Sequence, residues 1–338
     1  MLETRRAFQF AFAVLAAATA LAACSGGGCG NCSVPAFHNP TPSPTPTAPA
    51  GSPVATPTPT HTPTPTPTPT PSPTPTVNPL ACNQATPKLG AALAPFALLA
   101  GSTITNVGNT LVTYTGATHD DLVGVFPGTA ITGFPPGTDA DGAGAGGPIY
   151  GAGFNTNVGP PSAAQAALTT AYTTISATAP TVVLVGTPDL STTSSGLSNC
   201  GATGTLLCPP GTFGAGVYKA ATTASIATAN LTLDGGGNAQ SVFIFEIGTS
   251  LTTVLNAGVG GNVLLINGAG ACNIYWTEGA AATIGGATFN GNILTGPVDT
   301  GTESITINAT TFNGRALAKT AVSIPVAGGS LITNPGGS

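Results

Sequence analysis

The stretch from Val242 to Ile324 repeats one short pattern: an apolar pair, a glycine-rich corner, and then small or hydroxyl residues around one aliphatic residue. The apolar pieces read Phe243-Ile244-Phe245, Ile274-Tyr275-Trp276, Ile293-Leu294 and Ala316-Leu317. The small pieces read Ser250-Leu251-Thr252, Ala281-Ala282-Thr283, Ser304-Ile305-Thr306 and Ala321-Val322-Ser323. Successive apolar pieces begin 19 to 31 residues apart. This spacing predicts a stacked β-solenoid in which each copy is one coil.

The small pieces predict a flat outer face. Side chains alternate between the two faces of a strand, so each central aliphatic can point inward while its neighbours point outward. The predicted outward residues are Thr223, Ser225, Ser250, Thr252, Ala281, Thr283, Ser304, Thr306, Ala321 and Ser323. Exposed Thr is favoured in strands for other reasons, but here small groups recur at the same register in every copy. Lys319, Arg315 and Glu278 fall beside these columns, and Glu303 falls at an inward or corner position.

Columns of this kind would form a two-dimensional lattice. Neighbouring strands are about 4.7 to 4.9 Å apart, and alternate residues of one strand are about 6.6 to 6.8 Å apart. Small methyl and hydroxyl groups on such a lattice suit an ordered water layer comparable in spacing to ice, whereas charged groups would bind their hydration water too strongly. The face is therefore the best candidate for a functional surface.

The composition argues against a nucleic-acid-binding protein. Only 5% of the 338 residues are charged, the formal net charge is -5, and Lys and Arg together number six. A nucleic-acid-binding protein needs a basic stripe to neutralise phosphates, and none is present. The 41% hydrophobic content nevertheless indicates that part of the chain buries a core.

The N-terminus has the pattern of an export signal. Arg5 and Arg6 precede an apolar run from Ala7 to Ala23, which is typical of a secretory signal peptide over residues 1–23. The run ends in Leu21-Ala22-Ala23-Cys24, which resembles the lipobox of bacterial lipoproteins, with Cys24 as the lipidated residue. The alternative is an ordinary signal peptide followed by a chance cysteine. The lipobox predicts an exported protein, lipid-anchored to a bacterial membrane and exposed at the cell surface.

Six further cysteines would lie in an oxidising compartment, where disulfides persist. Cys200 and Cys208 flank a short loop and are expected to pair locally, and Cys82 and Cys272 are candidates for a second bridge. The Cys29-Gly-Asn-Cys32 spacing would also suit redox chemistry or a metal. It lies in a glycine-rich tether without a βαβ context, so a structural pair is the preferred interpretation.

Composition shifts divide the chain after the signal peptide. Residues 24–34 form the anchor and tether, and residues 35–80 form a Pro/Thr-rich stalk, since proline cannot join a sheet. Residues 81–338 form the folded domain, with early strands at 102–105, 111–115 and 129–132 and an irregular loop from 201 to 216. A helix is predicted from Pro161 to Ala179, with Ser162 as its N-cap. Its apolar stripe of Leu168, Tyr172 and Ile175 is expected to pack on the solenoid, and its position implies coils that are not stacked in sequence order.

Candidate catalytic and metal sites have simpler interpretations. His38 and His61 lie in the spacer region, and His119-Asp120-Asp121 is read as a solvated loop rather than an acid/base or metal cluster. Asp139 and Asp141 have a spacing found in Ca²⁺ loops but lack the downstream Glu of an EF-hand. We therefore predict neither an enzyme nor a metal or other cofactor. Phe245, Tyr275 and Trp276 recur at matching coil positions, so they are expected in the core or beneath the helix rather than on a sugar-binding platform.

From Leu89 to Ser323 the chain closely resembles the bacterial and fungal ice-binding-like family, often labelled DUF3494. The segments that carry the resemblance are Leu89-Gly90, 96–100, Val125, 127–134, Pro210-Gly211, 216–219, 231–235, 242–247, 273–276, 289–294 and 313–318. The resemblance implies a mostly β fold: a discontinuous three-faced β-solenoid with one long α-helix packed alongside. It also implies adsorption to an ice crystal surface through one flat face, without a cofactor.

Two other functions fit the same fold class. A carbohydrate-binding or cell-adhesion solenoid without ice activity would expose Trp276 and Tyr275 as stacking platforms. A solenoid polysaccharide lyase would need Asp clustered with Arg or Lys in a groove, and this chain has few basic residues.

Overall fold

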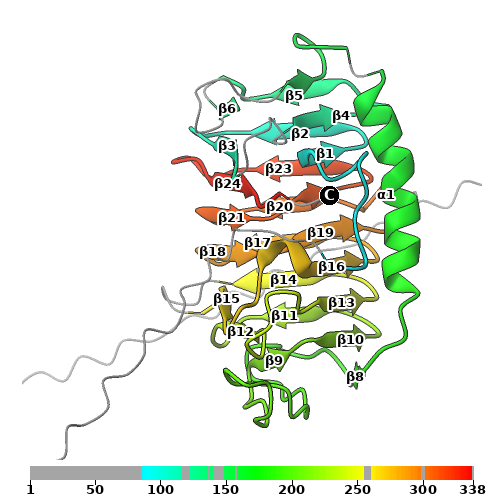
Figure 1. Cartoon of the computed structure of the whole chain (residues 1–338). Coiled ribbons are helices and arrows are strands. Elements are labelled where there is room, and N and C mark those ends of the chain that lie inside the picture. The colour runs from blue at the N-terminus through cyan, green and yellow to red at the C-terminus, as the bar shows by residue number, and fades with distance from the viewer. Residues whose placement is uncertain are drawn as a thin grey trace, which may run out of the picture. The chain divides into compact units, whose positions relative to one another are not determined.

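The computed structural model describes residues 85–115, 122–135, 137–139, 148–156, 158–254, 260–297 and 301–336. These residues form a stack of parallel strands with one long helix along its side (Figure 1). Several predictions concern residues outside this part of the chain: Cys24, Cys29, Cys32, Cys82, the stalk, His38, His61, His119-Asp120-Asp121 and Asp141.

The first side of the stack is a nine-stranded sheet, called here the helix-side sheet. In spatial order it consists of β7 (Ile149–Tyr150), β4 (Leu122–Val125), β1 (Phe96–Ala100), β22 (Ala316–Leu317), β19 (Asn292–Thr295), β16 (Ile274–Glu278), β13 (Phe243–Ile247), β10 (Gly216–Ala220) and β8 (Val182–Leu184). The short 3-10 helix η1 (Ala271–Asn273) leads into β16.

The second side is a seven-stranded sheet, called here the open sheet. Its spatial order is β11 (Ala224–Ile226), β14 (Leu251–Val254), β17 (Ala282–Gly285), β20 (Ile305–Ile307), β23 (Ala321–Ile324), β2 (Thr103–Asn106) and β5 (Ala130–Thr132).

The third side is divided between two sheets. One contains β15 (Val263–Ile266), β12 (Leu231–Asp234) and β9 (Thr212–Gly214). The other contains β18 (Thr288–Asn290), β21 (Thr311–Asn313), β24 (Leu331–Asn334), β3 (Leu111–Tyr114) and β6 (Thr138–Asp139). Seven coils therefore contribute one strand to each side, and β7, β8 and β9 extend the first and third sides at the ends of the stack. This confirms the predicted three-faced solenoid.

The coils are stacked out of sequence order, as the position of the helix predicted. The last coil, β22 to β24, pairs with the first, β1 to β3, through all three sides. Between β7 at one end of the stack and β8 at the other, the chain runs through α1 (Pro160–Ser176). The helix thus carries the chain from one end to the other, and the remaining coils build back toward the first.

An apolar ladder fills the interior of the stack. Phe245 stacks on Trp276 with ring centroids 4.2 Å apart and planes 11° apart, and Phe289 stacks on Phe312 at 5.4 Å and 12°. Tyr218 stacks on Phe245 at 5.1 Å. Aromatic pairs at these separations add to the stabilisation from apolar burial, so the recurring apolar pieces hold neighbouring coils in register.

The glycine corners are required where the coil turns tightly. Gly291 has a φ of 122°, and a Cβ there would lie 2.5 Å from Nε1 of Trp276. Both the backbone conformation and the contact exclude an ordinary side chain. The Asn-Gly-Asn corner therefore allows β18 to pass into β19 directly against the aromatic core.

The outer side of the helix-side sheet is covered by α1. Leu168 and Ile175 of the helix are buried, and Tyr172 is half-buried, so the predicted stripe does pack on the solenoid. The sheet residues that share this cluster are Phe96, Leu99, Leu122, Ile244, Tyr275, Leu294 and Leu317.

Three local predictions were wrong in detail. The helix begins at Pro160 and its N-cap is Gly159, not Ser162, because two prolines with fixed φ and no N–H suit the first turn. It ends at Ser176 rather than Ala179. The segment from 201 to 216 is not wholly irregular, since β9 lies within it.

Candidate functional site

Two columns of small side chains run along the outer side of the open sheet. In the first, Ser225, Thr252, Thr283 and Thr306 are successive partners in parallel register. Ser323 follows Thr306 in the same register. The sequence placed all five of these residues on one outer face, and the structure brings them together there.

This first column continues into strands from the start of the domain. Ser323 pairs with Thr105, and Thr105 pairs with Thr132. Both strands were predicted from the sequence, but these two threonines were not assigned to the face. The signal was present, because Thr103-Ile-Thr105 and Ala130-Ile-Thr132 repeat the alternation of Ser304-Ile-Thr306.

The second column lies two residues earlier in each coil, at the start of the strand or just before it. It contains the predicted residues Thr223, Ser250, Ala281, Ser304 and Ala321, and it continues through Thr103 and Ala130, which were not predicted. Thr103 pairs with both Ala321 and Ala130. The two columns together form seven rows, one for each strand of the open sheet.

Exposure follows the predicted alternation. Thr105, Thr132, Thr252 and Thr283 are exposed, and Ala130 is exposed in the second column. The other members of both columns are half-buried. Between the two columns lies a third, buried column of aliphatic residues that crosses all seven strands: Ala224, Leu251, Ala282, Ile305, Val322, Ile104 and Ile131. These side chains point into the core, so their neighbours in each strand point outward.

The face carries no charge within the described strands. None of the seven strands of the open sheet contains Asp, Glu, Lys or Arg. The accessible side chains of the two columns end in hydroxyl and methyl groups. The arrangement therefore provides a neutral surface on which small side chains repeat in register.

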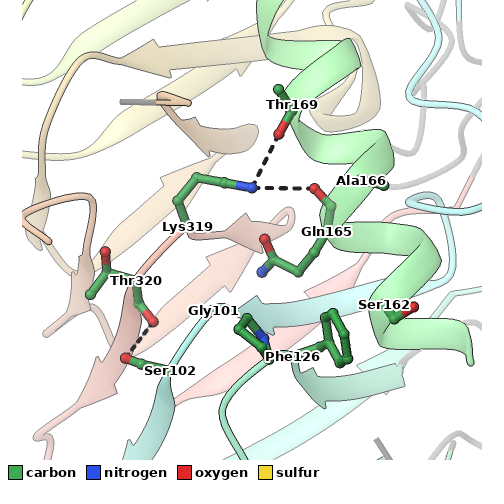
Figure 2. A pocket seen from close by; sticks show the side chains of 10 residues that line it. Gly101, Ser102, Phe126, Ser162, Gln165, Ala166, Thr169, Lys319 and Thr320 are labelled. Carbon is green, nitrogen blue, oxygen red and sulfur yellow. Dashed lines mark hydrogen bonds between the residues drawn. The ribbon is translucent and has the colours of Figure 1, made fainter. Parts of the chain in front are cut away.

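Lys319 lies beside the face, in a groove of about 520 Å³ between α1 and the coil corners (Figure 2). Its ammonium donates to Oγ1 of Thr169 at 3.1 Å and to the backbone oxygen of Gln165 at 3.4 Å. The side-chain amide of Gln165 in turn donates to the backbone oxygen of Ala318 at 3.0 Å. The lysine is thus turned toward the helix, where it ties α1 to the coil corner.

Three charged residues at the coil corners are buried. Arg315 is fully buried and donates to the oxygens of Ala94, Asn292 and Gly336 at 2.9, 2.9 and 3.0 Å. Glu303, which the sequence left at an inward or corner position, is also fully buried and accepts a hydrogen bond from Oγ1 of Thr320 at 3.0 Å. Arg315, Lys319 and Glu278 all lie outside the columns, as predicted. Lys319 and Glu278 lie at the corner that leads into the open sheet, whereas Arg315 lies at the corner between the third side and the helix-side sheet.

Glu278 is the most unusual of these groups. It ends β16 in register with the core residue Ile247, and its exposed fraction is 0%. Burial raises the pKa of Glu278 well above its usual value, against a smaller opposing contribution from the backbone N–H of Leu251. The carboxyl group of Glu278 therefore lies, shielded from solvent, at the corner that joins the helix-side sheet to the open sheet.

The aromatic residues are not available as a sugar-binding platform. Trp276 and Phe245 belong to the core, and Tyr275 lies under α1, all at 1% exposure or less. This confirms their predicted placement in the core or beneath the helix. It also contradicts the exposed stacking platform on which the adhesion alternative depended.

One predicted disulfide is present between Cys200 and Cys208. Cys272 is also disulfide-bonded, but Cys82 lies outside the described residues, so the pairing of these two stays a prediction. No cluster of His, Cys, Asp or Glu suited to a metal ion occurs among the described residues. No helix in that same part of the chain is both long enough and apolar enough to cross a membrane.

The family model for ice-binding-like proteins matches residues 98–327. The chain is 33% identical over 234 residues to an ice-binding protein of Nostoc sp., covering 68% of each chain. It is 49% identical over 80 residues to ice-binding protein 1 of Shewanella frigidimarina, a match that covers 23% of this chain and only 9% of that relative.

A solved structure shows the same architecture. The crystal structure of the ice-binding protein from the Antarctic ascomycete Antarctomyces psychrotrophicus is 30% identical, with a TM-score of 0.54. The likeness covers 72% of this chain and 97% of that one. Because the family model matches most of the chain and the Nostoc relative is 33% identical over two thirds of its length, this chain belongs to the ice-binding-like family.

Proposed function

We propose that this protein binds ice by adsorption through the outer side of its open sheet. The observation that supports this most directly is the pair of in-register columns, seven rows long and free of charge. The membership of the chain in the ice-binding-like family favours the same conclusion. The proposed function needs neither catalysis nor a cofactor.

The mechanism follows from the spacing and chemistry of the face. Rows about 4.8 Å apart and columns about 6.7 Å apart would hold water in a regular layer. Methyl groups exclude water from the gaps, while hydroxyl groups bond to the water that remains. When such a layer merges with the crystal, the adsorbed protein restrains further growth of the ice front.

The test is thermal hysteresis and ice-crystal shaping with the purified chain. In the double variant Thr252→Tyr, Thr283→Tyr, two bulky rings would stand on adjacent rows of the face, and we expect most of the hysteresis to be lost. The matched control is Thr288→Tyr, Thr311→Tyr, because these two threonines are also register partners but lie on the third side.

Each outcome has a clear meaning. Unaltered ice growth with the wild-type chain would reject ice binding. Activity lost in the control but kept in the first double variant would move the binding surface to the third side.

We also propose that the domain is displayed on the cell surface through a lipid on Cys24 and a stalk over residues 35–80. The lipobox-like sequence before Cys24 and the proline-rich composition of the stalk support this. Held at a distance from the membrane, the domain would bind the cell to ice or control ice near it.

The lipid anchor is tested by labelling cells that produce the chain with a radioactive fatty acid. Label should enter the wild-type protein and be absent from Cys24→Ala, whereas Cys29→Ala should be labelled normally. Equal labelling of Cys24→Ala and the wild type would reject the anchor.

A further inference from the structure

The terminal strands at the two ends of the solenoid differ in how their outer edges are covered. At one end the chain folds back over β7, so that Tyr150 bridges to Asn155 and the N–H of Ala152 donates to the oxygen of Thr129 at 2.6 Å. At the other end, β8 is hydrogen-bonded only to β10 among the described residues. Successive backbone groups of a strand point to opposite sides, so those of Val182 and Leu184 face away from β10.

The outer side of this last strand is also apolar and uncovered. Val183 is 63% exposed and Val185 is 91% exposed. A helix of 17 residues is about 26 Å long, whereas nine strands span about 38 Å. The helix is therefore too short to cover the whole sheet, and Figure 1 shows β8 beyond its last turn.

Natural proteins usually protect such an edge by keeping it very short, or with a charge, a proline, a bulge or a covering segment. β8 has three residues, so it offers the backbone groups of only two residues for pairing. Here the only charged residue from 177 to 215 is Asp189. Its carboxylate accepts hydrogen bonds from Ser191, Ala227 and Thr228, so its charge is turned inward. Although partial burial opposes it, this bonding lowers the pKa of Asp189.

The nearest charges on the sheet cancel each other. Lys219 of β10 is the register partner of Val183, and its ammonium lies 3.1 Å from Oε2 of Glu246. The end of the sheet is therefore neutral, and two copies of it can approach without like-charge repulsion.

We propose that β8 is a self-association edge at which a second copy of this chain pairs its own β8 in antiparallel fashion. A twofold axis through the pair makes the contact isologous, so one surface serves both partners and the assembly closes as a dimer. The outward backbone groups of Val182 and Leu184 would form the ladder, and Val183 would lie beside the partner's Val183.

The test is sedimentation equilibrium of the full chain over a range of concentrations. The wild type should approach twice the mass of one chain, which is 32.5 kDa. Val183→Lys and Val183→Asp should each weaken the association by at least about tenfold, since each places like charges opposite one another. Mixing the two variants should restore a dimer, because the new charges are then complementary.

The matched control is Val107→Lys, because Val107 is 56% exposed and lies next to β2, far along the stack from β8. It should associate like the wild type. A monomeric wild type, or undiminished association of Val183→Lys, would overturn the proposal. Failure of the mixed variants to associate would overturn the antiparallel pairing around Val183.

Discussion

The helix-side sheet and the open sheet are built from the same coils, yet their outer sides differ completely. Outside the first, Ile244, Tyr275 and Leu294 are large and apolar, and α1 covers them. Outside the second, Thr252, Thr283 and their neighbours are small and remain accessible to solvent. Both sheets are built from parallel strands of the same kind. The size and polarity of their outward side chains therefore decide whether α1 covers a sheet or leaves it exposed to solvent.

The largest expected effect comes from placing a charge on each side in turn. Leu294→Asp would bury an unpaired carboxylate under α1, and we expect a loss of about 3 to 5 kcal/mol in the free energy of unfolding. Thr306→Asp on the open sheet should change this free energy by less than about 0.5 kcal/mol, while lowering thermal hysteresis. Urea denaturation of both variants measures the difference, and similar losses in the two would show that the sides are not distinct in this way.

A smaller, pH-dependent effect is expected at the corner between the two sheets. The pKa of Glu278 is raised in the folded state, so the native protein holds a proton that the unfolded chain releases above the ordinary value of 4.5. Stability should therefore fall as the pH rises from that value toward the folded pKa, by at most about 1.4 kcal/mol per pH unit.

Glu278→Gln keeps the shape of the side chain and removes its titration. We expect this variant to be more stable than the wild type at neutral pH and to show a flatter dependence of stability on pH. Thermal unfolding at several pH values tests this, and parallel curves for the two proteins would contradict it.

The smallest effect is expected within the open sheet itself. Ala281→Thr adds a hydroxyl at a half-buried row position without changing the charge of the face. We expect the free energy of unfolding to change by less than about 0.5 kcal/mol, with a modest rise in thermal hysteresis at equal concentration. A fall in hysteresis would show that a methyl group at this row serves better than a hydroxyl.

Much of the architecture could be predicted because it depends on the alternation of inward and outward side chains along each strand. The apolar pieces around Phe245, Trp276 and Ile293 mark the core side of each strand, and the outward positions around Thr252 and Thr283 follow from the period of two. The helix could also be predicted, because Leu168 and Ile175 are apolar residues at helical spacing. Its exact start could not, because the helix begins with Pro160 and Pro161 after Gly159 and has no capping side chain.

The role of the face in ice binding stays a prediction, and so do the anchor at Cys24 and the pairing of Cys82 with Cys272. The burial of Arg315 was beyond sequence reasoning. Its three acceptors come from segments as distant as Ala94 and Gly336, which meet only when the last coil packs against the first.

The sequence by itself determined which residues of each strand point outward and inward, because side-chain alternation is a property of a single strand. Only the tertiary structure decided that Thr105 and Thr132 lie in the same column as Ser323. That contact requires the chain to cross the stack through α1 and return. The free energy of bringing the last coil against the first depends on how all the coils between them pack together. A local sequence pattern carries no information about that packing.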